Sequence, residues 1–361
     1  MSKTYCPLPW IGLNILPGEI RPCCHWEGAP IPLEQVREDM LSGKEIAGCQ
    51  QCRFAEQIGS KSKRQDAIEK YGIIHEVKPQ LLEVTFDNIC NLKCRGCCSY
   101  TSHMWRSDET EIYGKPFIDK KYVESIVDID CSSLKEIDIS GGEPFLSKNV
   151  ERFLGKLVDE EIIQNIDMGI VVSGYTAPSD TVFDALSKTK KLYLSISIDA
   201  IGELNDYFRS GSKFETVLKN IEFLNKLYKK DTHTIIIHST VSIYNVNCIR
   251  EVEDYFAKHY PHFIVEHRLL QWPEQLAVQN MPNDLKDSVR PIIESFGPEY
   301  KDILEAINIP NKDVYGHFLN FHNSLDRLRN EKLPNEFLDN YITNNQIRTD
   351  STIFFKQQMR G

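Results

Sequence analysis

The stretch LLEVTFDNICNLKCRGCC, from Leu81 to Cys98, places a β-rich run directly before four closely spaced cysteines. Alternation of strands and helices after this point predicts right-handed βαβ units and a parallel sheet. Six such units are fewer than the eight of a closed barrel, so we expect an α/β fold with a partial (β/α)6 TIM-like barrel over residues 79–271. Its β-rich runs lie at 81–86, 134–140, 166–173, 191–199, 233–243 and 263–271. Helical periodicity between them covers 120–129, 149–162, 180–189, 214–230 and 249–260.

Both flanks of this region have a different character. Residues 1–78 are rich in cysteine, proline, glycine and charge, which predicts a small amino-terminal cysteine-rich module. Residues 272–361 are polar with helical periodicity, which predicts a helical carboxyl-terminal extension. Helices are expected in these flanks over 31–43, 52–72 with a break at IGSKS, 282–297 and 318–330.

Composition narrows the class of protein. The chain has 361 residues, a net charge of −10 and 11 cysteines, nine of them in the first 98 residues. An odd cysteine count without a secretory signal argues against a disulfide framework, whereas such clustering is typical of metal sites. The acidic balance argues against broad nucleic-acid binding, although a local basic groove stays open. No apolar run approaches the roughly 18 residues of a membrane helix, so we expect a cytoplasmic protein that is not in a membrane.

Three of the clustered cysteines have the spacing Cys90-x3-Cys94-x2-Cys97. Three thiolates on one tight loop can bind three irons of a [4Fe–4S] cube and leave the fourth iron open to a small molecule. A zinc site is the alternative, with Cys98 or His103 as the fourth ligand. Spacing alone leaves both interpretations open.

A second motif, GGEP at 141–144, follows the next β-rich run. Paired glycines allow close approach to a ligand, and Glu143 offers a carboxylate to a cationic amine. Together, the cysteine triplet and GGEP resemble the radical S-adenosylmethionine (SAM) superfamily, over about residues 79–270. The resemblance implies that the three cysteines bind a [4Fe–4S] cluster whose open iron chelates SAM. One electron then cleaves the sulfonium, and the resulting 5′-deoxyadenosyl radical abstracts a hydrogen from the substrate.

The same resemblance implies contacts to SAM. GGEP meets the methionine amino group, Ser197 and Asp199 meet the ribose hydroxyls, and Asn245 lies near adenine and methionine. Arg209 pairs with the methionine carboxylate, for which a guanidinium fork is well suited. The full set of implied cofactor contacts is Gly141, Gly142, Glu143, Pro144, Ser173, Ser197, Asp199, Arg209 and Asn245.

The sequence departs from the family pattern at two places. Gly96 stands before the third cysteine, where an aromatic residue often lies near the adenine. The third β-rich run ends in VVSGYTA, where Thr-Asn-Gly is common, and Ser173 takes over a polar contact there.

The amino-terminal module carries its own candidate ligands: Cys6, Cys23, Cys49 and Cys52. Chemistry alone fits zinc or a full iron–sulfur cluster equally. The spacing Cys6-x11-Gly18-x4-Cys23 before CQQC resembles the auxiliary-cluster module called SPASM, in its shortened twitch form. This implies one auxiliary [4Fe–4S] cluster, although the module usually follows the barrel. Cys24 could replace Cys23, but Cys23 fits the Gly-x4-Cys spacing.

These features predict a radical SAM enzyme of the SPASM/twitch type that modifies a C–H bond. The expected substrate is a peptide or protein side chain; the alternatives are a nucleotide, a nucleic-acid base or a small metabolite. An electron donor such as flavodoxin or ferredoxin is implied as a partner. A structural zinc-binding protein without catalysis is the alternative from another class.

Overall fold

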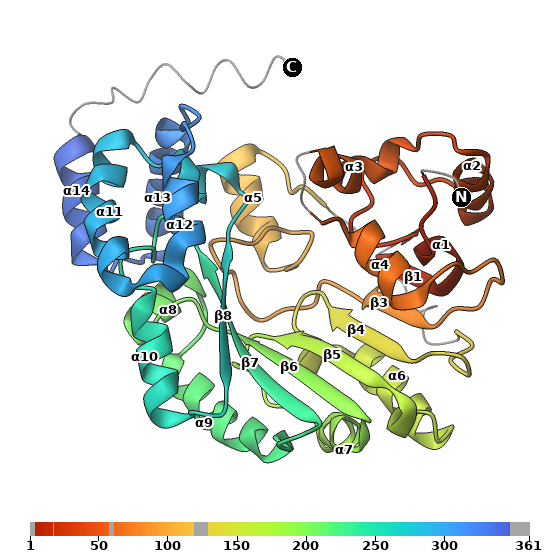
Figure 1. Cartoon of the computed structure of the whole chain (residues 1–361). Coiled ribbons are helices and arrows are strands. Elements are labelled where there is room, and N and C mark those ends of the chain that lie inside the picture. Colours follow the sequence, from red (N-terminus) through yellow and green to blue (C-terminus); the bar gives the residue numbers. More distant parts are fainter. Residues whose placement is uncertain (1–3, 17, 58–60, 119–128, 347–361) are drawn as a thin grey trace.

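The computed structural model describes residues 4–16, 18–57, 61–118 and 129–346, and Figure 1 shows their arrangement. In this part of the chain one eight-stranded sheet has the order β2-β1-β3-β4-β5-β6-β7-β8. All neighbours from β1 to β8 along this order are parallel, and β2 alone pairs antiparallel. The strands are β1 Gly12–Leu16, β2 Glu19–Arg21, β3 Leu81–Thr85, β4 Glu136–Ser140, β5 Asp167–Val172, β6 Lys191–Ser197, β7 His233–Val241 and β8 Ile264–Leu269.

The six predicted strands are confirmed as β3 to β8, in sequence order across the sheet. Four predicted helices between them are confirmed, and the helix expected over 120–129 lies, but for its last residue, outside the described residues. Serine caps start two of them: Ser147 accepts from the Val150 amide at 3.3 Å, and Ser179 accepts from Val182 at 3.4 Å. The helices after β3 are α5 Trp105–Tyr113, α6 Lys148–Asp159, α7 Asp180–Lys188, α8 Glu203–Phe208, α9 Phe214–Leu224 and α10 Arg250–His259.

Strict alternation along the strands sorts the two faces of the sheet. One face is a continuous apolar layer that packs against α6, α7 and α9 (Figure 1), and Leu194 and Ile237 are fully buried there. We call the opposite face the open face. It carries Asp138, Tyr193 and His238, which are half-buried or exposed. Polar side chains therefore gather on the side of the sheet that α6, α7 and α9 do not cover.

The amino-terminal stretch continues the same sheet. Residues of β1 pair in parallel with β3, from Gly12 opposite Leu81 to Ile15 opposite Val84. Gly18, with φ of +78°, makes the turn between β1 and β2, a backbone conformation that glycine adopts without strain. The helices of this stretch are α1 Leu8–Ile11, α2 Leu33–Ser42, α3 Gln50–Gln57 and α4 Lys63–Tyr71.

Helices follow β8 to residue 346. The two expected over 282–297 and 318–330 are confirmed as α11 Asn283–Phe296 and α13 Tyr315–Arg329, with α12 Lys301–Asn308 between them and α14 Glu336–Gln346 after them. Trp105 of α5 stacks on Phe321 of α13 at 6.0 Å between ring centroids, so α13 packs against the helix that follows β3. No helix of the described residues combines the length and apolar character needed to cross a membrane.

Candidate active site

The segment Asp87–Cys98, here called the cysteine loop, leaves the carboxyl end of β3. Cys90 and Cys94 are buried in one cluster with Leu92, and Cys97 packs against it. The Cys97 amide donates to the Cys94 carbonyl at 2.9 Å, which closes a tight turn. The loop thus brings the three predicted ligands together, at the strand end where parallel sheets bind ligands.

Cys98 lies apart from the other three thiols. It is buried but belongs to no cluster with them, and its pKa is raised by burial and by the nearby Glu109 of α5. His103, the other fourth ligand considered for zinc, accepts a hydrogen bond from the Cys90 amide through Nδ1 at 3.2 Å. Neither residue joins the three-thiol group in this structure.

The pKa values of the three ligand thiols shift in different directions. A hydrogen bond between Cys94 and Cys97 raises the pKa of Cys94 and lowers that of Cys97, whereas Cys90 and Cys94 both stay protonated. Burial and then the neighbouring Cys94 raise the pKa of the Cys90 thiol to about 12. Metal ligation requires thiolates, so binding of a cluster would displace these protons. The donor set is therefore chemically suited to iron–sulfur ligation. The suitability lies in the donor atoms: no group of three or more His, Cys, Asp or Glu side chains in the described residues is already arranged around a metal position, so ligation would require these side chains to reorient.

The glycines of GGEP fit against the backbone of the cysteine loop. A Cβ atom on Gly142 would lie 2.2 Å from the Ile89 carbonyl oxygen, and one on Gly141, whose φ is +134°, would lie 2.8 Å from the Asp87 carbonyl. The Gly142 amide donates to Asp87 at 3.2 Å and the Glu143 amide to Ile89 at 2.7 Å. The close approach that the sequence predicted towards a ligand is here an approach to the chain itself, which fixes GGEP beside the cysteine loop.

Glu143 and Ser173 form one unit at the ends of β4 and β5. The Glu143 carboxylate is 1% exposed and accepts from the Ser173 amide at 2.8 Å, from the Ser173 hydroxyl, and from the Phe145 amide at 3.1 Å. Burial raises the pKa of Glu143, whereas these bonds lower it. Pro144 begins the short 3-10 turn Pro144–Leu146 that follows.

A buried ion pair joins the ends of β6 and α8. Arg209 Nη2 lies 2.8 Å from Asp199 Oδ2, and the Asp199 side chain is 0% exposed. Arg209 Nη1 is also 3.8 Å from the Cys94 sulfur. Arg209 Nε is buried and has no hydrogen-bond partner among the described residues, so this donor is available to an acceptor on a ligand.

The two remaining predicted contacts sit differently. Asn245 is buried, and its side-chain amide already donates hydrogen bonds within the protein, to the carbonyls of Asp199 at 2.6 Å and Thr240 at 3.0 Å. Its Oδ1 accepts from the Ser242 amide at 2.8 Å. Ser197, at the end of β6, is half-buried and pairs in register with His238 of β7 on the open face.

Several neighbours of the thiols escaped sequence reasoning. Tyr175 packs against the thiol cluster, and the Trp105 indole donates to the Cys94 carbonyl at 2.9 Å. A Cβ on Gly96 would lie 3.2 Å from the Phe208 ring, so an aromatic side chain from α8 fills the space beside this glycine. The aromatic Tyr175 in VVSGYTA was the one signal in the sequence that could have indicated such a contact.

Four of the five cysteines of the amino-terminal stretch surround one cavity. Cys6, Cys23, Cys49 and Cys52 all line it, together with Trp26 and Met40 among others. Burial raises the pKa of Cys6 to about 12, with Cys49 and Cys52 adding to the effect. Cys24 does not line this cavity; it is exposed, and its sulfur lies 2.8 Å from Lys63 Nζ.

Comparison with known proteins identifies the domain. The model of the Radical SAM superfamily matches residues 84–247. The chain is 23% identical over 235 residues to the GTP 3′,8-cyclase of Aliarcobacter butzleri (strain RM4018), covering 64% of this chain and 68% of that protein. Native anSMEcpe with bound AdoMet and Cp18Cys peptide is 18% identical with a TM-score of 0.38, covering 69% of this chain and 65% of that one.

Streptococcus suis SuiB bound to S-adenosylmethionine is 16% identical with a TM-score of 0.39, covering 77% of this chain and 60% of that one. The present chain thus spans less than two thirds of both solved chains. The range matched by the family model contains the three cysteines, GGEP and the Asp199–Arg209 pair. Residues 84–247 therefore match a radical SAM superfamily domain, and members of that superfamily are enzymes that use a [4Fe–4S] cluster with SAM.

Proposed function

We propose that the cysteine loop holds the radical cluster and that the groups around it hold SAM. The observation that carries this is the juxtaposition of two buried thiols, Cys90 and Cys94, and the partly buried Cys97 with Arg209, whose Nε has no partner among the described residues. When bound, the cluster would supply one electron to SAM, which splits into methionine and a 5′-deoxyadenosyl radical that takes hydrogen from the substrate. Arg209 would orient the methionine carboxylate, and buried Glu143 would accept from its amino group.

A second cluster is proposed in the amino-terminal stretch, as in SPASM and twitch modules. The support is the single cavity lined by Cys6, Cys23, Cys49 and Cys52, whose four thiols suffice to ligate a closed cluster. Exposed Cys24, engaged with Lys63, is the weaker candidate ligand. A closed cluster here would carry electrons to or from the active site.

For the substrate we propose a peptide or protein side chain, presented on the open face. Three apolar residues on that face are partly exposed: Val171 of β5 is 42% exposed, Tyr193 of β6 is 44% exposed and Ile264 of β8 is 49% exposed. Small molecules are usually enclosed in pockets that bury most of their surface, whereas exposed apolar side chains suit a longer ligand. A cavity of about 220 Å³ between α4 and the sheet, lined in part by Glu83 and Asp138, offers room for one side chain.

Metal analysis tests the two-cluster proposal. After anaerobic assembly with iron and sulfide, we expect about eight irons and about eight sulfides per chain. Incubation with SAM and dithionite should then yield 5′-deoxyadenosine. Stoichiometric zinc without sulfide would instead establish the structural zinc protein and remove the catalytic proposal.

Substitution of Tyr193 tests the substrate proposal. Peptide mixtures are expected to raise 5′-deoxyadenosine formation above the rate without substrate, whereas GTP is not. Tyr193→Ala should raise the KM for an active peptide about tenfold, because an exposed aromatic contact is lost, and leave the peptide-independent rate unchanged. Leu41→Ala, at a 52% exposed residue of α2, is the matched control. Stimulation by GTP alone would point to a nucleotide substrate.

A further inference from the structure

The cysteine loop is joined to the segment around Arg209 by two backbone hydrogen bonds. The Lys93 amide donates to the Ser210 carbonyl at 2.8 Å, and the Arg95 amide donates to the Phe208 carbonyl at 2.7 Å. The two segments therefore run antiparallel, with Cys94 directly opposite Arg209. This pairing sets the separation between the second cluster cysteine and the guanidinium proposed to orient SAM.

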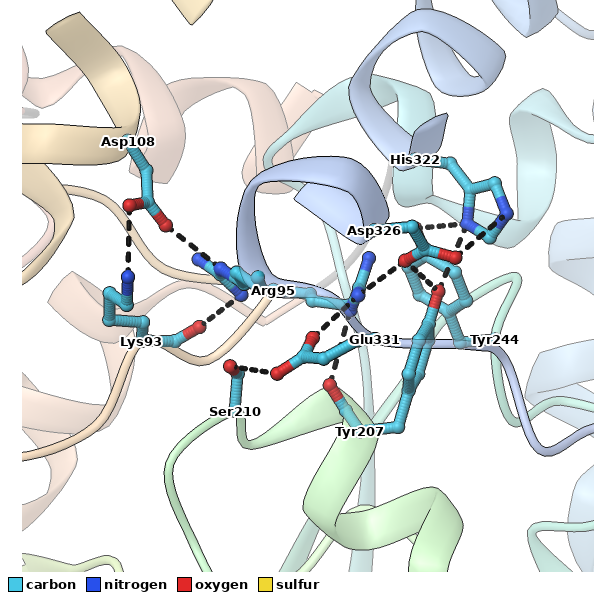
Figure 2. A network of polar contacts seen from close by, with 10 residues as sticks. Lys93, Arg95, Asp108, Tyr207, Ser210, Tyr244, His322, Asp326 and Glu331 are labelled. Carbon is cyan, nitrogen blue, oxygen red and sulfur yellow. Dashed lines mark hydrogen bonds and ion pairs between the residues drawn. The ribbon is translucent and has the colours of Figure 1, made fainter. Parts of the chain in front are cut away.

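These two hydrogen bonds form a short ladder. Asp326 and Glu331, from the carboxyl-terminal helices and the residues after them, contact the ladder through Arg95 (Figure 2). The Arg95 side chain is 0% exposed, and its Nη2 contacts Asp326 at 2.6 Å and Glu331 at 2.7 Å. Its guanidinium lies over the Tyr207 ring, 3.7 Å from the centroid. A buried guanidinium needs this compensation, since an unpaired buried charge is strongly unfavourable.

Asp326 and Glu331 both contact the two segments: Asp326 accepts from Arg95 and from the Tyr207 hydroxyl, and Glu331 reaches the residue next to Arg209. One Glu331 carboxylate oxygen accepts from Arg95 in the cysteine loop, and the other accepts from the Ser210 hydroxyl, next to Arg209. Figure 2 shows Glu331 between these two side chains. Because a carboxylate has two acceptor oxygens, one residue can tie the segments together without bending either.

Arg329, two residues before Glu331, contacts the cysteine loop at a second point. Its Nη1 donates to the Lys93 carbonyl at 2.8 Å, and its Nε donates to Asp108 at 2.8 Å. Asp108 also accepts from Lys93 Nζ at 2.9 Å, and the Arg329 guanidinium lies 4.6 Å from the Trp105 ring centroid. Both neighbours of Cys94 in the sequence are therefore held by residues from beyond position 325.

We propose that Glu331 is a positioning residue of the radical SAM site, which fixes the Cys94 thiol against the Arg209 guanidinium. The inference rests on the proposed SAM contact of Arg209 and adds that the carboxyl-terminal helices complete the site. Without the Glu331 carboxylate, Arg95 and Ser210 lose their shared partner, and the segments keep their backbone hydrogen bonds and the contacts of Arg95 with Tyr207. The separation of thiol and guanidinium then varies, and SAM is held less tightly.

Amide hydrogen exchange tests the bracing directly, in the protein before cluster assembly. Glu331→Ala should speed exchange of the Lys93 and Arg95 amides about tenfold or more, while amides of the β6–β7 core stay protected. Ser210→Ala is a smaller change and should speed exchange of the same amides by less. In the Glu331→Ala/Ser210→Ala double variant it should add little, because both substitutions remove the same Ser210–Glu331 hydrogen bond. Glu336→Ala, at an exposed carboxylate of α14, is the control and should change neither.

SAM affinity tests the consequence. After cluster assembly, Glu331→Gln should keep the wild-type iron content but bind SAM about tenfold more weakly, measured by equilibrium dialysis. Unchanged exchange at Lys93 and Arg95, exchange that rises equally in the sheet core, or wild-type SAM affinity would each overturn the proposal. Failure of the wild-type protein to bind SAM would instead refute the proposed function, and the exchange data would still decide the bracing.

Discussion

Replacement of Cys94 by alanine should reduce 5′-deoxyadenosine formation at least about a thousandfold, because the three thiols act as one ligand set. Cys94 is the central thiol: it is buried, its carbonyl accepts from the Trp105 indole at 2.9 Å, and its sulfur lies 3.8 Å from Arg209. The rate with SAM and dithionite, together with iron content, measures the effect. About four irons should be lost and about four retained in the amino-terminal stretch.

Cys98→Ala is the control for this experiment. Cys98 is as buried as its neighbours but faces Glu109 rather than the other thiols. Its alanine variant should keep the iron content and cleave SAM within about twofold of wild type. If the Cys94→Ala protein cleaves SAM as well as wild type does, the assignment of the triplet is wrong.

Replacement of Cys23 and of the adjacent Cys24 should give opposite results. Cys23→Ala is expected to lose about four irons per chain, because Cys23 lines the same cavity as Cys6, Cys49 and Cys52. Cys24→Ala should keep them, because the Cys24 thiol is exposed and contacts Lys63 instead. Iron and sulfide analysis after anaerobic assembly distinguishes the two.

The outcome also separates the auxiliary cluster from the radical cluster. Both variants should retain cleavage of SAM without substrate, since the cysteine loop is unchanged in each. If Cys24→Ala loses iron and Cys23→Ala keeps its full iron content, Cys24 rather than Cys23 is the ligand. Full iron in both would contradict an auxiliary cluster that depends on either cysteine.

The parallel sheet was predictable from sequence because each of its six main strands is a local β-rich run followed by a helical period. Strand β1 was not predicted: GLNIL is a five-residue strand that pairs with the three-residue β2 on one side and, on the other, with β3, far along the chain. The triplet and GGEP were visible because each is contiguous. Their mutual packing, with Gly142 against Ile89, was not, because spacing carries no information about which backbone a glycine approaches.

The bracing of the cysteine loop could not be predicted for a related reason. Arg95 and Glu331 are 236 positions apart; Arg95 occupies a variable position of the cysteine motif, and Glu331 stands in no recognisable motif. Arginine is rarely fully buried, so its sequence position suggests a surface residue. Only the folded chain reveals that α13 and Glu331, two residues beyond its end, meet the loop that carries the three thiols.

The β1–β3 pairing has a consequence for how the protein can be divided. An unpaired parallel strand offers its backbone donors and acceptors to other molecules and promotes aggregation. In this chain β1 covers β3, and the short antiparallel β2 then forms the outer border. Cutting the chain before residue 79 would uncover β3, an apolar strand with Leu82 and Val84, along its whole length. The cysteine-rich stretch therefore also protects an edge of the sheet that other molecules could otherwise pair with.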